Sequence, residues 1–135
     1  MTSTVWLAYV EPHALTDPDR RVAGREQRLR AIPDAVLPEP TAVLDWLTNR
    51  GAAFRRLADE KGRAFNALMD DRDNVCGRLT AAGVSVYATV RQSATTTVDL
   101  CVEAFTAQDC ESWRGHQFVR RKDGDWRCTR CAHTL

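Results

Sequence analysis

The feature that most constrains this chain is a pair of cysteines near its C-terminal end, Cys128 and Cys131, with two residues between them. That spacing lets one turn of chain place both thiolates on the same tetrahedral metal ion. Cys110 and His116 lie upstream and can supply the other two ligands. The sequence therefore predicts one Zn²⁺ bound by these four side chains. Because four protein ligands leave no open position for water, we expect the zinc to be structural.

The residues between the two ligand pairs predict a β-hairpin. Asp123-Gly124 favours a two-residue type I′ turn, in which both central residues take a positive φ. In the register centred on that turn, the opposed pairs are Lys122 and Asp125, Arg121 and Trp126, Arg120 and Arg127, and Val119 and Cys128. His116 then falls opposite Cys131. We therefore expect the two ligand pairs to meet at the open end of the hairpin.

Residues 110–135 resemble the zinc-ribbon class, in which two ligand pairs at the ends of short strands hold one zinc ion. The resemblance covers about a fifth of the chain and implies the same four ligands. The chain departs from the ribbon pattern in the longer spacing between Cys110 and His116, and in Ala132, where ribbons often have glycine. His133 and Cys101 are the alternatives to Cys110 as a ligand.

Other uses of a Cys-x-x-Cys pair fit this sequence less well. A thioredoxin-like redox pair would be followed by most of a βαβ unit, whereas four residues follow Cys131. A zinc deaminase needs a His-x-Glu motif, and none of the three histidines is followed by such a glutamate. Unliganded thiols in a reducing cytoplasm are the remaining alternative to a zinc site.

The composition indicates a cytoplasmic protein. The chain has 135 residues, a length that suits one domain or one domain with a small metal module, and its net charge is +1. Five cysteines, an odd number, argue against a disulfide framework. We expect neither a signal peptide nor a membrane span, because no apolar run approaches the ~20 residues needed.

The remaining pattern predicts an α+β domain over residues 1–109, followed by the ribbon at 110–135. Its expected elements are a strand over 4–10 that ends before Pro12, a helix over 17–32, a proline-rich connector over 33–40, a short helix over 42–48, a long helix over 52–82, and two antiparallel strands over 84–90 and 97–105. The predicted architecture is thus an antiparallel sheet packed on one long helix.

Two faces of these elements have further implications. The apolar stripe of the helix over 52–82 is longer than a small core needs, so it predicts a homodimer, unless a bend at Gly62 or Gly77 folds the stripe onto one chain. The two strands alternate, which predicts one buried face and places Cys101 on the polar face with Asp99 and Glu103.

Basic residues indicate a nucleic-acid contact. Residues 110–135 carry six basic and three acidic side chains, a net of +3, and the basic ones are Arg114, Arg120, Arg121, Lys122, Arg127 and Arg130. Arg120 and Arg127, if opposed, would repel each other unless an anion lay between them. Arg121 can stack on Trp126 as a cation–π pair. A second arginine stripe, at Arg21, Arg25 and Arg28, predicts a solvated face or, as the alternative, a phosphate contact.

The sequence therefore favours a small zinc-binding accessory protein that contacts nucleic acid, such as a transcription- or DNA-associated regulator. The alternative is a protein-binding adaptor or inhibitor in which zinc only stiffens the contact surface. An enzyme subunit ranks third, because no phosphate-binding glycine motif, nucleophile elbow or His-Glu-x-x-His helix is visible and no catalytic residue can be nominated.

Overall fold

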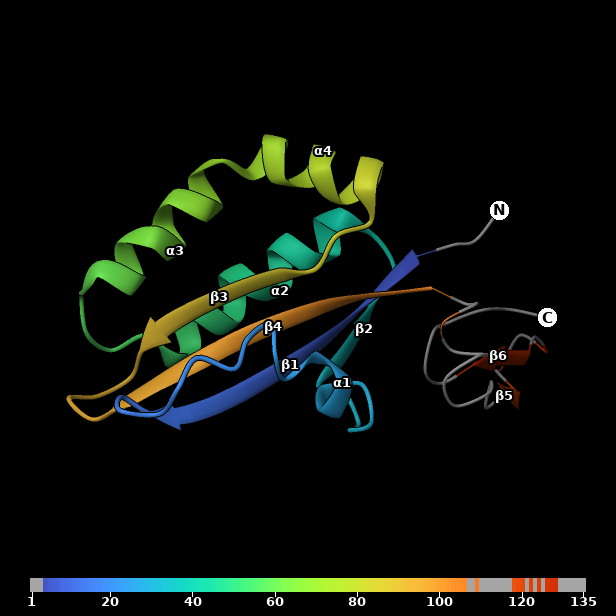
Figure 1. Ribbon diagram of the computed structural model, residues 1–135. Helices are drawn as coiled ribbons and strands as arrows, with labels where there is room; N and C mark the ends of the chain where they lie inside the picture. The colour runs from blue at the N-terminus through green and yellow to red at the C-terminus, as the bar shows by residue number, and fades with distance from the viewer. Residues whose placement is uncertain are drawn as a thin grey trace.

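The computed structural model describes residues 4–106, 109, 118–120, 122, 124 and 126–128 (Figure 1). The chain runs through β1 (Thr4–Ala14), α1 (Arg25–Arg28), β2 (Ala35–Leu37), α2 (Pro40–Phe54), α3 (Glu60–Asp70), α4 (Arg72–Ala82), β3 (Val86–Arg91), β4 (Thr96–Thr106), β5 (Phe118–Arg120) and β6 (Trp126–Cys128). None of the described helices is long and apolar enough to cross a membrane.

Four strands form one antiparallel sheet in the order β2-β1-β4-β3. This confirms the predicted α+β class, and β3 and β4 are the two alternating strands expected from the sequence. In β4, Val98, Leu100 and Val102 point into the main core, as predicted. Because successive strand residues face opposite sides, Asp99, Cys101 and Glu103 line the other face.

The first strand is longer than predicted, because β1 continues through Pro12 to Ala14. Pro12 lies opposite Val98 of β4. The three-residue strand β2 pairs with β1 only from Trp6 to Ala8, so at Pro12 no described strand neighbours β1 on that side. A proline is tolerated there because its missing N–H costs no ladder hydrogen bond.

Helices α2, α3 and α4 cover one face of the sheet (Figure 1). Helix α2 begins at Pro40, a residue suited to the first helical position, and runs on past Gly51 to Phe54. The predicted end of this helix at residue 48 is therefore wrong. A Cβ at this glycine would lie 2.1 Å from Cζ of Phe65, so its role is to let α3 approach α2 closely.

The single long helix predicted over 52–82 is not formed. After α2 the chain leaves helical geometry, and the N–H groups of Arg56 and Leu57 bond the carbonyl of Arg91. Asp59 then caps α3 by accepting a 2.9 Å hydrogen bond from the N–H of Gly62, and α4 follows a break at Asp71. Gly83 ends α4 with a φ of +57°, as expected for its position.

Both halves of the predicted long stripe pack on the same core. Phe65 of α3, and Val75 and Leu79 of α4, are buried with the apolar residues of α2 and the sheet. The stripe that suggested a homodimer is thus folded onto one chain, and the premise of that prediction is removed.

The second face of the sheet is also covered, so the predicted single buried face is wrong. The segment between β1 and β2 lies over it, with Arg28 and Leu29 buried there (Figure 1). Only four residues of this segment form α1, in place of the helix expected over 17–32. The side chains of Asp17 and Asp19 bond nearby backbone N–H groups and so stabilise turns in competition with a helix.

Candidate functional site

The C-terminal hairpin is present, but its register differs by one residue from the predicted one. The opposed pairs are Phe118 and Cys128, Val119 and Arg127, and Arg120 and Trp126. The connection spans residues 121–125, and Gly124 has a φ of +93°. Longer connections with one glycine at positive φ are the common alternative to two-residue turns. Arg120 therefore does not oppose Arg127, and the predicted repulsion between them is wrong.

Cys128 is the one predicted zinc ligand within the described residues. It is 2% exposed and packs with Cys101, Phe105 and apolar residues of β1 on the second face of the sheet. The other three predicted ligands, Cys110, His116 and Cys131, and the alternative His133, lie outside the described residues. In the part of the chain that the structure describes, no three His, Cys, Asp or Glu side chains are grouped to hold a metal ion.

Cys101, the other alternative ligand, lies in an environment that favours the neutral thiol. Its Sγ is 3.8 Å from Oε1 of Glu11, and burial raises the pKa of the thiol well above its usual range. Within the described residues, Cys101 also belongs to no group of three His, Cys, Asp or Glu side chains that could hold a metal ion.

The predicted nucleic-acid residues are described only in part. Arg120 ends β5 and Lys122 lies in the turn, and both are exposed. Arg127 lies in β6. Arg114, Arg121 and Arg130 are outside the described residues, so the predicted stacking of Arg121 on Trp126 is not described either.

The second arginine stripe has a different role from the two that the sequence suggested. Arg28 is buried and paired with both Glu103 and Glu11, the latter at 2.8 Å. Arg25 lies 3.1 Å from Glu103, and Arg21 binds Asp19. Each guanidinium therefore has a carboxylate within the chain. Arg25 and Arg28 attach the segment between β1 and β2 to β4, and Arg21 also reaches Thr89 of β3 at 3.5 Å.

Tyr87 completes the buried ion cluster around Glu103. Its hydroxyl donates a 2.6 Å hydrogen bond to Oε1 of Glu103. Burial and this hydrogen bond raise the pKa of Tyr87 to about 12. Burial alone would lower the pKa of Arg28, but its hydrogen bonds to Glu11 and Glu103 raise it above the ordinary value. Acidic and basic side chains of the cluster thus face each other, as buried ionisable groups require.

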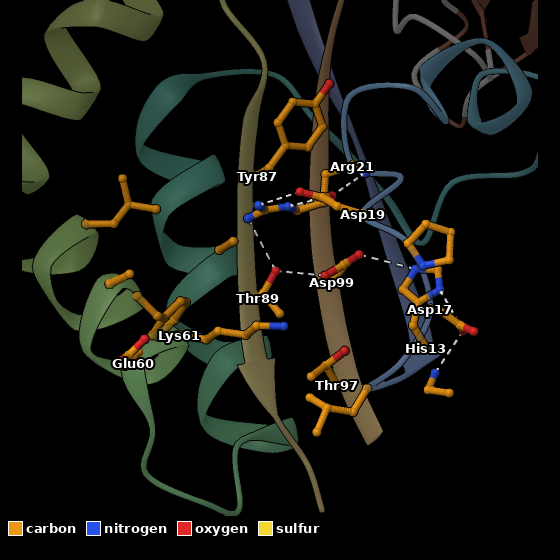
Figure 2. Close-up of a pocket in the computed structure, with 17 residues that line it drawn as sticks. His13, Asp17, Asp19, Arg21, Glu60, Lys61, Tyr87, Thr89, Thr97 and Asp99 are labelled. Carbon is orange, nitrogen blue, oxygen red and sulfur yellow. Dashed lines mark hydrogen bonds and ion pairs between the residues drawn. The ribbon is translucent and has the colours of Figure 1, made fainter. Parts of the chain in front are cut away.

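A cleft of about 520 Å³ opens beside this cluster, between α3 and the segment that follows β1. Figure 2 shows side chains from β1, β3, β4 and α3 converging on it. Its size lies within the range of about 300–1,000 Å³ that is typical of ligand sites. The cleft has apolar walls, and its polar groups include His13, Asp17, Lys61, Thr89 and Asp99.

A buried carboxylate forms the floor of the cleft. Thr89 donates a 2.7 Å hydrogen bond to Oδ1 of Asp99. Nε2 of His13 lies 3.2 Å from Oδ2 of the same carboxylate, yet the two atoms are not aligned and Nε2 is buried without a hydrogen bond. Nδ1 of His13 lies 3.9 Å from Oδ2 of Asp17. Within the described residues, no lysine or arginine forms an ion pair with Asp99.

Two cations face the cleft from opposite walls. The guanidinium of Arg21 donates hydrogen bonds of 3.1 and 2.8 Å to the carboxylate of Asp19. These hydrogen bonds hold the pKa of Asp19 well below its usual range. Lys61 extends from α3 toward β3 (Figure 2) and has no carboxylate of the described chain within ion-pair distance. The positive charge of Lys61 nevertheless helps to lower the pKa of Asp19 from across the cleft.

Sequence reasoning missed this cleft because its residues come from four separate segments. One signal was available: Asp99, which lines the cleft, is one of three polar or reactive residues on one face of an otherwise apolar strand. No protein-family model matches the sequence, and neither a curated protein nor a solved structure matches it.

Proposed function

We propose that this chain is a small zinc-binding accessory protein that contacts nucleic acid through its C-terminal hairpin. The observation that carries the proposal is the polarity of the hairpin along its length. Cys128 is buried at its base, whereas Arg120 and Lys122 are exposed toward its turn. A buried ligand end and an exposed basic end suit a module that is fixed at one side and contacts phosphates at the other.

Zinc would stiffen this module at its base. Cys128 supplies one thiolate, and the proposed remaining ligands are Cys110, His116 and Cys131, outside the described residues. Four protein ligands would complete the coordination, so the metal would be structural. Holding the hairpin in one conformation lowers the entropy lost when Arg120 and Lys122 engage a phosphate backbone.

The alternative is a protein-binding adaptor or inhibitor that uses the same hairpin. Val119 is about half exposed on β5, next to Arg120, and offers an apolar contact that a phosphate backbone would not need. The dependence of binding on salt separates the two functions. Phosphate contacts release condensed counterions and weaken steeply as salt rises, and an apolar protein contact does not.

The decisive experiment is a salt titration of the full-length protein with duplex and single-stranded DNA. On duplex DNA, each phosphate contact should add about −0.9 to the log–log slope of affinity against salt. Arg120→Ala/Lys122→Ala should bind more weakly and with a flatter slope. The matched control is Arg63→Ala/Arg78→Ala, which removes two exposed arginines from α3 and α4.

Two outcomes would contradict the proposal. One is the absence of binding by the wild-type protein even at low salt. The other is equal binding by Arg120→Ala/Lys122→Ala and the wild type. Either would make the adaptor the leading function.

A further inference from the structure

The cleft beside α3 runs along the free edge of the main sheet. β3 is the last strand of that sheet, and among the described residues it pairs only with β4 apart from one bridge between Leu57 and Arg91. Three consecutive residues, Tyr87, Ala88 and Thr89, line the cleft. Neighbouring side chains of a strand point to opposite faces, so a cleft that touches all three must lie against the edge of the strand.

Backbone groups of β3 are directed into this cleft. The carbonyl of Arg91 accepts hydrogen bonds of 3.0 and 3.2 Å from Arg56 and Leu57, on the side away from β4. In an antiparallel pair, alternate residues direct their N–H and C=O groups away from the partner strand, so those of Thr89 and Tyr87 point the same way as those of Arg91. No backbone group of the described residues bonds them on that side.

The charge of the cleft indicates what kind of segment would fit. Its carboxylates are those of Asp17, Asp19, Glu60 and Asp99, and its lysine and arginine side chains are Lys61 and Arg21, so acidic side chains exceed these basic ones by two. Arg21 neutralises Asp19. The buried carboxylate of Asp99, with His13 beside it, makes no direct ion pair with a lysine or arginine of the described chain, and Arg21 acts on it only from beyond Thr89. A cation from outside would supply that missing partner.

We propose that this cleft binds an extended, lysine- or arginine-containing segment of a partner protein, which adds to the sheet as a strand beside β3. Its main chain would bond the open N–H and C=O groups of Thr89 and Tyr87, the mode by which exposed strand edges take up peptides. A basic side chain would reach Asp99 and Asp17, and the alternate apolar side chains would contact Ala64 and Leu68 of α3. The site does not involve the C-terminal hairpin, so it stands whether or not the hairpin binds nucleic acid.

The test begins with a random peptide library displayed on phage and selected on the immobilised full-length protein. Enriched peptides should alternate apolar residues with lysine or arginine. One such peptide, synthesised, should shift the backbone amide resonances of Tyr87, Ala88 and Thr89 and leave those of the hairpin residue Val119 unchanged. A selection without enriched sequences would overturn the proposal, and so would shifts confined to the hairpin.

Two matched comparisons then separate strand addition from simple charge attraction. Asp17→Lys/Glu60→Lys should lower the affinity for the peptide by at least about tenfold through like-charge repulsion. Asp70→Lys, at the far end of α3, should leave the affinity unchanged. The same peptide, N-methylated at alternate amides, keeps its charges but loses its main-chain donors, and it should no longer bind. Unchanged affinity in either comparison would contradict the proposal.

Discussion

Arg28 and Glu103 form an ion pair with almost no access to solvent, since their side chains are 1% and 0% exposed. Arg28 ends α1, in the segment between β1 and β2, and Glu103 comes from the central strand β4. The pair therefore attaches that segment to the second face of the sheet. Glu11, Arg25 and Tyr87 add further hydrogen bonds to the same two side chains, whereas Nε of Arg28 is buried without one among the described residues.

Removal of either partner should destabilise the protein strongly. Arg28→Ala and Glu103→Ala should each lower the free energy of unfolding, by up to about 3–5 kcal/mol, because each breaks a buried ion pair. Arg25 still pairs with Glu103 in the first variant and Glu11 with Arg28 in the second, which reduces the cost of each. The double variant should cost less than the sum of the two, since both changes remove the same interaction. Denaturant unfolding measures these differences.

The control for this prediction is Arg50→Ala. Arg50 pairs with Asp34 at 2.8 Å, but both side chains are substantially exposed. A pair of this kind contributes about 0–1 kcal/mol. A cost for Arg28→Ala no larger than that for Arg50→Ala would show that the Arg28–Glu103 pair does not anchor the segment.

The phenol of Tyr87 should lose its proton at a higher pH than an ordinary tyrosine. Its pKa is raised from 10.0 to about 12, first by burial and then by its bond to Glu103. Because its pKa is higher in the folded state, the phenol contributes to the free energy of unfolding. That contribution is complete below pH 10 and is lost as the pH rises through about 12. Tyr87→Phe should therefore flatten the fall in stability between these two pH values. A profile identical to that of the wild type would contradict the assignment.

The same pKa can be read directly from phenolate absorbance. The chain has two tyrosines, so Tyr9→Phe leaves Tyr87 as the only phenol. The absorbance of that variant should have its midpoint near 12, whereas a midpoint at the ordinary value of 10.0 would show that Tyr87 is not buried against Glu103.

Two helical glycines should respond to alanine in opposite directions. A Cβ at Gly51 would lie 2.1 Å from the buried ring of Phe65, so Gly51→Ala should cost about 1–3 kcal/mol of stability by overpacking. A Cβ at Gly77 in α4 meets nothing within 4 Å. Gly77→Ala should stabilise the protein by about 0.5–1 kcal/mol through helix propensity. Thermal unfolding of both variants checks the prediction, and the same sign for both would contradict it.

Local sequence patterns predicted the strands well and the helices less well. The period-two alternation of 84–90 and 97–105 located β3 and β4 because each strand has one wholly apolar face. The helix pattern over 52–82 was continuous in three–four spacing, yet the chain breaks at Asp59 and Asp71. Those breaks bring α3 and α4 onto the core that α2 already covers, and a periodic pattern cannot indicate such a turn in space.

The function of buried polar residues was harder to predict. The sequence correctly placed Asp99, Cys101 and Glu103 on one face, but a polar face of a strand normally indicates exposure to solvent. Only the fold shows that Arg28, from a segment more than seventy residues earlier, neutralises Glu103. The register of the C-terminal hairpin differed by one residue because Gly124 permits a connection longer than the type I′ turn.

The proposed zinc site predicts one metal ion per chain. Elemental analysis of the purified protein should give a zinc content near one equivalent, and Cys128→Ser should lose it. Cys101→Ser serves as the control and should retain the metal, since Cys101 lies on β4 and is not one of the four proposed ligands. Full zinc occupancy in Cys128→Ser would remove Cys128 from the site. Loss of zinc in His133→Ala but not in Cys110→Ser would reassign the fourth ligand to His133.

The central claim, a zinc-stiffened hairpin that contacts nucleic acid, is tested most directly by measuring DNA binding with and without the metal. Fluorescence anisotropy of labelled duplex DNA at low salt would compare the full-length protein as purified, after chelation, and after zinc is returned. The account predicts that chelation weakens binding and that zinc restores it, while circular dichroism shows the main sheet and helices still folded. Equal affinity before and after zinc removal would contradict it.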